Sequence, residues 1–144
     1  MNTTHRLIEF VGNHWGLALA FLGITILIIY NELRRRLAGT QQLGPHAATL
    51  AMNTDATVIL DVREDSEYKQ GHIANAVHIP LGQLAKRLTE LDKYRERPLI
   101  AYCRTGNRSN SAAQLLHKHG FTTVHNLAGG IVAWQNANLP VTKK

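Results

Sequence analysis

The sequence has 144 residues, a formal net charge of +6 at neutral pH and a single cysteine. That length allows one soluble domain of roughly 100 residues beside a short appendage. The single cysteine excludes an intramolecular disulfide and any zinc site built from several cysteines. The positive charge favours anionic partners, but the basic residues are scattered apart from the run 34–36, so no nucleic-acid partner is expected.

The chain begins with a long apolar segment. About 22 residues, Phe10–Asn31, pass without a formal charge, and Gly16–Tyr30 is nearly all apolar, which is long enough to cross a bilayer of about 30 Å. The alternative is a cleaved signal peptide, which Glu9 and the absence of a small-x-small cleavage site disfavour. We therefore expect an uncleaved transmembrane anchor over residues 1–32, with the lipid bilayer as its partner.

Arg34, Arg35 and Arg36 follow this segment and outnumber the cations before it. Since basic flanks tend to stay in the cytoplasm, they predict a single-pass inner-membrane protein whose following domain faces the cytosol. The stretch after them carries no periodic pattern, so residues 33–44 are expected to form a juxtamembrane linker. The soluble domain then spans residues 45–144.

The soluble domain alternates apolar strands with helices. Strands are predicted at Thr57–Val62, Ala76–Ile79, Leu99–Tyr102 and Val124–Leu127. Helices are predicted at 45–52, 65–69, 81–94, 111–119 and 131–136. This alternation indicates an α/β fold with an open, mostly parallel sheet, in which sites gather at the carboxyl ends of the strands.

Seven consecutive residues between a strand and a helix combine a nucleophile with cations: Cys103, Arg104, Thr105, Gly106, Asn107, Arg108 and Ser109. A helix N-terminus directs free N–H groups and a partial positive charge at whatever lies in front of it. Two arginines add full charges. We therefore expect a Cys103 pKa below the free value of about 8.5 and a reactive thiolate near neutral pH.

Within this loop, Gly106 allows a turn with positive φ and Ser109 is expected to cap the following helix. The loop amides form a cradle suited to an oxyanion. The alternative is a buried, inert cysteine. Two arginines beside it would be costly in a packed interior, which favours the reactive interpretation.

The segment Cys103-Arg104-x-Gly106-x-Arg108-Ser109 resembles the active-site loop of single-domain rhodaneses. The resemblance covers nearly all of Pro45–Val141. Further motifs follow in the same order as in that family: Asp61-Val62-Arg63 with Glu67-Tyr68, Gly71-His72-Ile73, Ala76-Val77-His78-Ile79-Pro80, and Leu127-x-Gly129-Gly130 with Ala133-Trp134. With the expected anchor, the chain is similar to a rhodanese-like sulfurtransferase tethered to the membrane.

The resemblance implies a five-stranded parallel sheet flanked by helices and a ping-pong reaction without a cofactor. Cys103 would take sulfane sulfur from thiosulfate or a related anionic donor and pass it to cyanide or a thiol. The amides of residues 104–109 would cradle the persulfide, and Arg104 and Arg108 would hold the donor.

Other motif residues have mainly structural interpretations. Asp61, Arg63 and Glu67 are spaced to form a charged network beneath the site. The histidines have no Cys/His ligand spacing, so no metal is expected, and Trp134 is interpreted as a core anchor. Asn75 and Asn138 stand where the family usually has glycine, which puts two local turns in doubt.

Two other function classes stay open. Phosphatases and arsenate reductases of the same fold are disfavoured because their loops follow Cys-x5-Arg, whereas four residues separate Cys103 from Arg108. The other class is a membrane-tethered sulfur carrier or protein-binding module without turnover of its own. The intact cysteine loop argues against pure scaffolding, although an unidentified protein partner is compatible with either class.

Overall fold

The computed structural model describes residues 13–37, 40–54 and 56–143. The chain divides into two compact units, Met1–Leu37 and Ala38–Lys144.

The first unit contains the long helix α2 (Trp15–Leu37). No proline interrupts it, and large apolar side chains such as Leu17, Phe21 and Leu27 are exposed along it. Within the described part of the chain, none of the helices combines the length and the hydropathy that a bilayer crossing requires. The anchor over residues 1–32 stays a prediction, and its first twelve residues lie outside the described ones.

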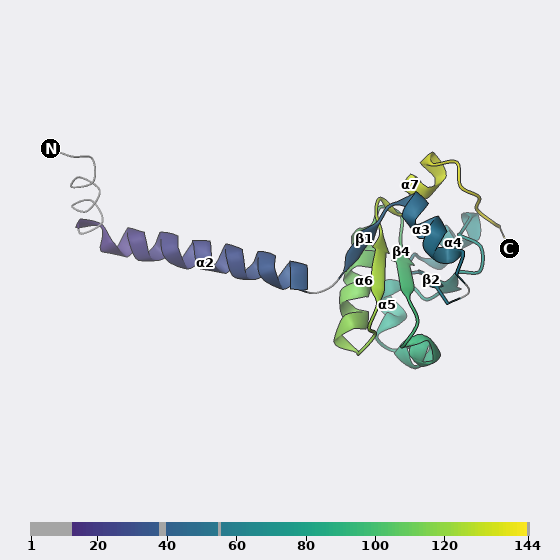
Figure 1. Cartoon of the computed structure of the whole chain (residues 1–144), viewed down its shortest axis with the longest axis horizontal. Coiled ribbons are helices and arrows are strands. Elements are labelled where there is room, and N and C mark those ends of the chain that lie inside the picture. The colour runs from purple at the N-terminus through teal and green to yellow at the C-terminus, as the bar shows by residue number, and fades with distance from the viewer. Residues whose placement is uncertain (1–12, 38–39, 55, 144) are drawn as a thin grey trace. The chain divides into compact units, whose positions relative to one another are not determined.

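The second unit is built on one parallel sheet of five strands in the order β1-β5-β4-β2-β3 (Figure 1). The strands are β1 (Gln41–Leu43), β2 (Val58–Asp61), β3 (Val77–His78), β4 (Leu99–Tyr102) and β5 (Val124–Leu127). The central strands β2 and β4 are buried along their whole length because helices cover both of their faces. The α/β fold with a parallel sheet is therefore confirmed.

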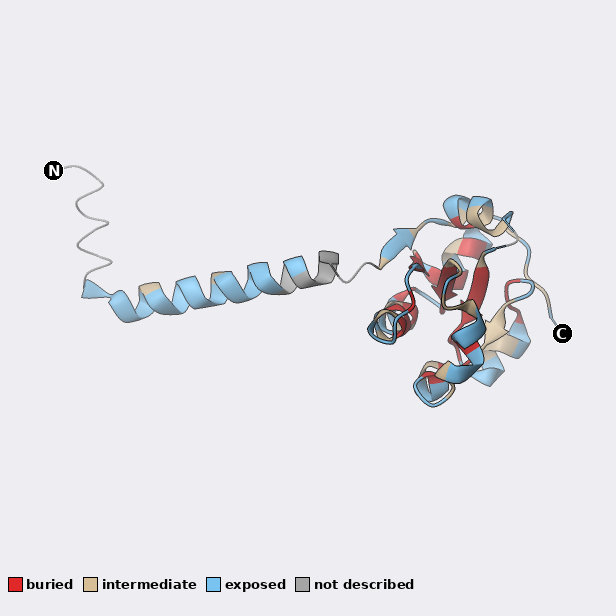
Figure 2. Ribbon diagram, turned by 60° about the horizontal axis from the view of Figure 1, so that its bottom comes forward, coloured by how far each residue is buried: buried red, intermediate tan, exposed pale blue. Residues whose placement is uncertain are grey.

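The sheet separates two apolar clusters. Successive strand residues point to opposite faces, so Leu60 belongs to one cluster and Ile59 to the other. Figure 2 shows the buried strands between the half-exposed helices. The helices are α3 (Pro45–Met52), α4 (Asp65–Gln70), α5 (Leu81–Leu84), the 3-10 helix η1 (Leu88–Tyr94), α6 (Asn107–Lys118) and α7 (Gly130–Asn136).

Three local predictions were wrong. The expected linker contains strand β1, which pairs with β5 from Gln41↔His125 to Leu43↔Leu127; three residues are too few to show a periodic pattern. The expected helix over 81–94 is two short pieces, α5 and η1, whose leucines Leu84 and Leu91 are both fully buried. Helix α6 begins at Asn107 rather than at 111.

The two asparagines at family glycine positions keep the glycine-like backbone. Asn75 has φ 61° and Asn138 has φ 57°. Asparagine tolerates the left-handed region better than other non-glycine residues. Both turns therefore form without glycine.

Candidate active site

Cys103 follows the last residue of β4 and lies at the carboxyl end of the sheet. Its side chain is 1% exposed and belongs to the apolar cluster beneath α6. Gly106 then takes φ 102° as the residue before α6, which turns the loop back toward the cysteine. The positive φ predicted for Gly106 is thus present.

Hydrogen-bond donors surround the thiol. The Gly106 N–H donates to Sγ at 3.1 Å, and the Ser109 hydroxyl lies 3.4 Å from Sγ. Burial alone raises the pKa of Cys103, but hydrogen bonds from the Ser109 hydroxyl and from the amides of Ser109, Gly106 and Thr105 outweigh it and lower the pKa below its ordinary value. The loop therefore favours a thiolate, as its placement before a helix predicts.

Ser109 does not cap α6, contrary to the prediction. Gly106 is the residue before the helix, and no side chain caps it. Ser109 lies in the first turn, fully buried, where its hydroxyl faces Cys103 and donates to Asn126 Oδ1 at 2.5 Å. As the third residue of α6, Ser109 has its side chain on the buried face of the helix, where its hydroxyl contacts the thiol rather than the helix terminus.

The two arginines of the loop differ. Arg104 is exposed, whereas the Arg108 guanidinium is paired with Glu67: Nη1 donates to Oε2 at 2.7 Å and Nη2 to Oε1 at 2.8 Å. Hydrogen bonds from Ser109 and the loop amides are the main causes that lower the Cys103 pKa, and the charge of Arg108 also interacts with Cys103. The sequence predicted that the two arginine charges and the helix N-terminus lower the Cys103 pKa together; hydrogen bonds contribute most, and the Arg108 charge is shared with Glu67.

Glu67 is fixed from two sides. Its pairing with Arg108, aided by the Glu64 amide, which donates to Oε2 at 3.1 Å, lowers the pKa of Glu67 to about 2. The same amide contact forms a capping box at the start of α4. Helix α4 is thereby tied to the cysteine loop through one ion pair.

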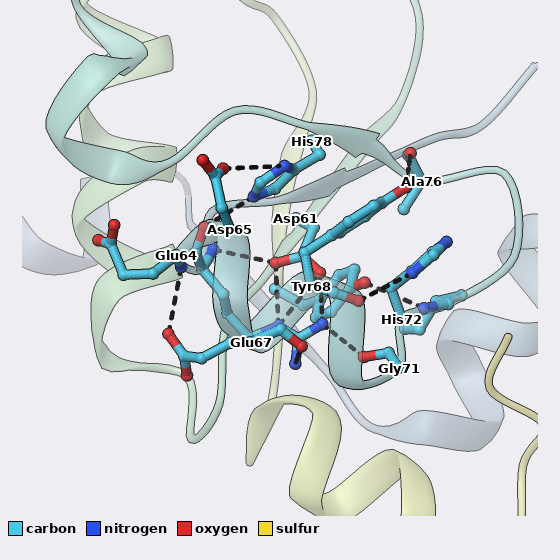
Figure 3. A network of polar contacts seen from close by, with 12 residues as sticks. Asp61, Glu64, Asp65, Glu67, Tyr68, Gly71, His72, Ala76 and His78 are labelled. Atoms are coloured by element: carbon cyan, nitrogen blue, oxygen red, sulfur yellow. Dashed lines mark hydrogen bonds and ion pairs between the residues drawn. The ribbon is translucent and has the colours of Figure 1, made fainter. Parts of the chain in front are cut away.

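The expected charged network has a different layout, shown in Figure 3. Arg63 binds Asp61 with Nη2 to Oδ2 at 2.6 Å and donates to the carbonyls of Glu67 and Gly71. Burial lowers the pKa of Arg63, but the hydrogen bonds and charge of Asp61 raise it above its ordinary value. Asp61 and Arg63 thus form one buried pair, and the Glu67 carboxylate joins the loop instead.

Tyr68 is stacked between two histidines beside this pair (Figure 3). Its ring lies 3.7 Å from His72 and 4.2 Å from His78, measured between centroids. His72 Nδ1 faces the Tyr68 carbonyl at 3.0 Å, and His78 Nε2 faces the Arg63 carbonyl at 2.9 Å. A ring nitrogen of each histidine is thus hydrogen-bonded to a backbone carbonyl.

The start of the loop is held by α7. The amide of Ile131 donates to the Cys103 carbonyl at 2.8 Å, and the amide of Val132 donates to the Arg104 carbonyl at 3.2 Å. A Cβ at Gly130 would lie 2.5 Å from the Arg104 and Cys103 backbone, so only glycine fits. Trp134, further along α7, is buried and donates from Nε1 to the Pro140 carbonyl at 2.9 Å, in line with its predicted anchoring role.

Sequence reasoning missed two residues linked to the loop, Asn126, which contacts it, and Gln42, which contacts Asn126. Asn126 is buried in β5 and donates from Nδ2 to the Gly106 carbonyl at 3.0 Å and to Gln42 Oε1 at 2.9 Å. The one signal in the sequence was an asparagine inside an apolar strand, where this residue type is depleted. Gln42 gave no signal because its strand was interpreted as linker.

The sequence matches the rhodanese-like domain family over residues 45–137, and the chain belongs to this family. The protein YibN of Escherichia coli strain K12 is 25% identical over 139 residues, which are 96% of this chain and 97% of YibN. The thiosulfate sulfurtransferase GlpE of Coxiella burnetii strain RSA 331 is 41% identical over 78 residues, 54% of this chain and 71% of GlpE. A solved structure, a rhodanese-related protein from Thermoplasma volcanium, aligns with a TM-score of 0.66 at 29% identity, covering 72% of this chain and 99% of its own.

Proposed function

We propose that this protein is a sulfurtransferase in which Cys103 carries sulfane sulfur as a persulfide. The observation that carries the proposal is the arrangement of N–H donors around Sγ, with the Gly106 amide at 3.1 Å, at the start of α6. Such donors stabilise a thiolate and equally the terminal sulfur of a persulfide. Relatives named as sulfurtransferases, GlpE among them, support the same reaction class.

The chemistry needs no outside oxidant or reductant. The thiolate attacks the sulfane sulfur of thiosulfate; a bond from Sγ to that sulfur forms, the bond to the sulfite sulfur breaks, and sulfite leaves with the electron pair. Cyanide or a thiolate then attacks the outer sulfur and departs as thiocyanate or as a persulfide. Cys103 returns as a thiolate.

Thiosulfate is the proposed donor, together with related small anions. Arg104 is exposed beside the loop, whereas Arg108 already binds Glu67. Arg104 therefore makes the first contact with the anion, and Arg108 orients the loop. The name of the relative GlpE adds support for thiosulfate.

Intact mass of the full-length protein in detergent tests the reaction. Incubation with thiosulfate is expected to add one sulfur atom to the wild type and none to Cys103→Ser, and cyanide is expected to remove it. A stable persulfide that cyanide or thiols do not discharge would indicate a sulfur carrier. Hydrolysis of aryl phosphates that is lost in Cys103→Ser would overturn the proposal in favour of a phosphatase.

We further propose that residues 1–32 anchor the chain in the inner membrane, with the family domain in the cytosol. The support is the apolar run Gly16–Tyr30, the basic run 34–36 after it, and the exposed apolar side chains of α2. Water is a poor solvent for that many exposed leucine and isoleucine side chains, which lipid would accommodate. Carbonate extraction of membranes tests it, since an anchored protein stays in the pellet.

A further inference from the structure

The side chain of Asn126 links strand β5 to the cysteine loop. It is 3% exposed, and all of its polar groups are used within the described part of the chain. Nδ2 donates one hydrogen to the Gly106 carbonyl at 3.0 Å and the other to Gln42 Oε1 at 2.9 Å, and Oδ1 accepts from the Ser109 hydroxyl at 2.5 Å. Both hydrogens of Nδ2 and the Oδ1 atom thus have partners.

The orientation of this amide follows from its partners. The Gly106 carbonyl can only accept a hydrogen bond, so the nitrogen of Asn126 must face it. A flipped amide would place two carbonyl oxygens about 3 Å apart without a proton between them. Asn126 therefore holds the Gly106 carbonyl, while the N–H of the same Gly106 donates to Cys103 Sγ at 3.1 Å.

Gln42 completes this chain of contacts from strand β1. It lies at the sheet edge, and its register partner is Asn126 itself. The strand stands outside residues 45–137, over which the family match runs. Gln42 therefore lies before the family domain in the sequence, yet it is linked to the Cys103 loop through the side chain of Asn126.

We propose that Asn126 and Gln42 are positioning residues for Cys103, which act through Gly106. Gln42 keeps the Asn126 amide in its productive orientation, and Asn126 keeps the Gly106 N–H directed at the sulfur. Strand β1 is then part of the apparatus that sets the reactivity of the thiolate. The inference rests on the proposed role of Cys103 as nucleophile but not on the identity of its donor.

Ser109 complicates one readout and requires its own control. Its hydroxyl has a single hydrogen, which lies within reach of both Asn126 Oδ1 and Cys103 Sγ. Loss of the Asn126 side chain frees that hydrogen for the thiolate, which by itself favours ionisation. The effect through Gly106 is therefore isolated in a Ser109→Ala background, as in a double-mutant cycle.

The pH midpoint of Cys103 alkylation in the full-length protein measures the effect without any sulfur transfer. In the Ser109→Ala background, Asn126→Ala is expected to raise the midpoint by about one further unit, since a hydrogen bond to a charged group is at stake. In the otherwise wild-type chain, Gln42→Ala is expected to raise it by about half a unit, and Gln42→Glu, which retains an acceptor oxygen, to restore it. Gln41→Ala on the same strand is the matched control and leaves it unchanged.

Gln42 is exposed, so its variants fold even where loss of buried Asn126 unfolds the domain. None of the substitutions alters Arg108, whose charge interacts with Cys103, or its partner Glu67. The added charge of Gln42→Glu would by itself raise the midpoint, so a restored midpoint in that variant is due to the acceptor oxygen. The positioning role would be overturned if Gln42→Ala had the wild-type midpoint and if Ser109→Ala/Asn126→Ala had the midpoint of Ser109→Ala alone. A wild type that transfers no sulfur, yet shows the midpoint shifts, would overturn the proposed function and leave the positioning role standing.

Discussion

Glu67 and Arg108 are 41 positions apart in the sequence, and their side chains meet in a two-point ion pair with N···O distances of 2.7 and 2.8 Å. The pair joins α4 to the first turn of α6, directly behind the cysteine loop. Because both ends are partly buried, the pair restrains the loop more than an exposed ion pair would.

Replacing Glu67 is expected to make unfolding less sensitive to acid. The pKa of Glu67 is lowered from 4.5 to about 2 in the folded protein, so its stabilisation is complete above 4.5 and is lost as the pH falls toward 2. Glu67→Gln should lower the free energy of unfolding by about 0.5–1 kcal/mol at neutral pH. That difference should shrink between pH 4.5 and 2 in urea titrations.

The matched control is Glu96→Gln, at an exposed glutamate that has no ion pair with the residues described by the structure. It should change neither the stability nor its acid dependence. A Glu67→Gln difference that is the same at pH 7 and at pH 2.5 would contradict the role of the ion pair.

Gly130 is expected to be irreplaceable. A Cβ there would come within 2.5 Å of the Cys103 and Arg104 carbonyls, and φ is 59°. Gly130→Ala should cost about 2–4 kcal/mol of stability and displace the loop, with loss of sulfur transfer. Gly82→Ala, where a Cβ meets nothing within 4 Å, should be neutral or stabilise by up to about 1 kcal/mol. Thermal unfolding and a thiocyanate assay measure both.

Asn138 tests whether the left-handed turn carries strain. Its φ is 57° and its side chain is exposed. Asn138→Ala should destabilise by about 1 kcal/mol, whereas Asn138→Gly should change stability by less than about 0.5 kcal/mol because glycine relieves the strain but loosens the unfolded chain. Asn136→Ala, on an exposed position of helix α7, is the control. Equal losses for alanine and glycine at 138 would indicate a side-chain role instead.

The sequence predicted the central strands well because their apolar runs are short, uninterrupted and bounded by turn residues. The segments Leu99–Tyr102 and Val124–Leu127 form strands with the predicted bounds. The edge strand β1 was missed because Gln41 and Gln42 expose polar side chains and depend on pairing with β5, which is a long-range contact that no local pattern encodes. The prediction of one continuous helix over 81–94 was wrong for a related reason. Leucines at helical spacing are equally compatible with two short helices.

The part of the candidate site that could be predicted is the part whose residues are neighbours in the sequence. Cys103, Gly106 and Ser109 lie within seven residues and meet at the thiol. The pairing of Arg108 with Glu67 was not predictable, because opposite charges 41 residues apart give no local signal. The sequence gives the charge of Arg108, but its pairing with Glu67 is visible only in the folded structure.

The membrane proposal predicts a definite topology. With the basic run 34–36 on the cytoplasmic side, a fluorescent protein fused after Lys144 should be bright, and alkaline phosphatase fused there should be inactive. Replacing Arg34, Arg35 and Arg36 by glutamine should weaken this bias. An active phosphatase fusion to the otherwise unchanged chain would refute the orientation. If the protein were recovered in the supernatant after carbonate extraction, the anchor itself would be refuted.

The last prediction concerns what lowers the pKa of Cys103. Hydrogen bonds from Ser109 and the loop amides outweigh burial, so Ser109→Ala should raise the midpoint of iodoacetamide alkylation by about one unit. Arg104→Ala should leave the midpoint nearly unchanged, because its guanidinium is exposed and screened, yet it should raise the KM for thiosulfate severalfold. The two variants thereby separate thiolate formation from donor binding. A midpoint that follows Arg104 and ignores Ser109 would mean that free charge, rather than hydrogen bonding, activates the thiol.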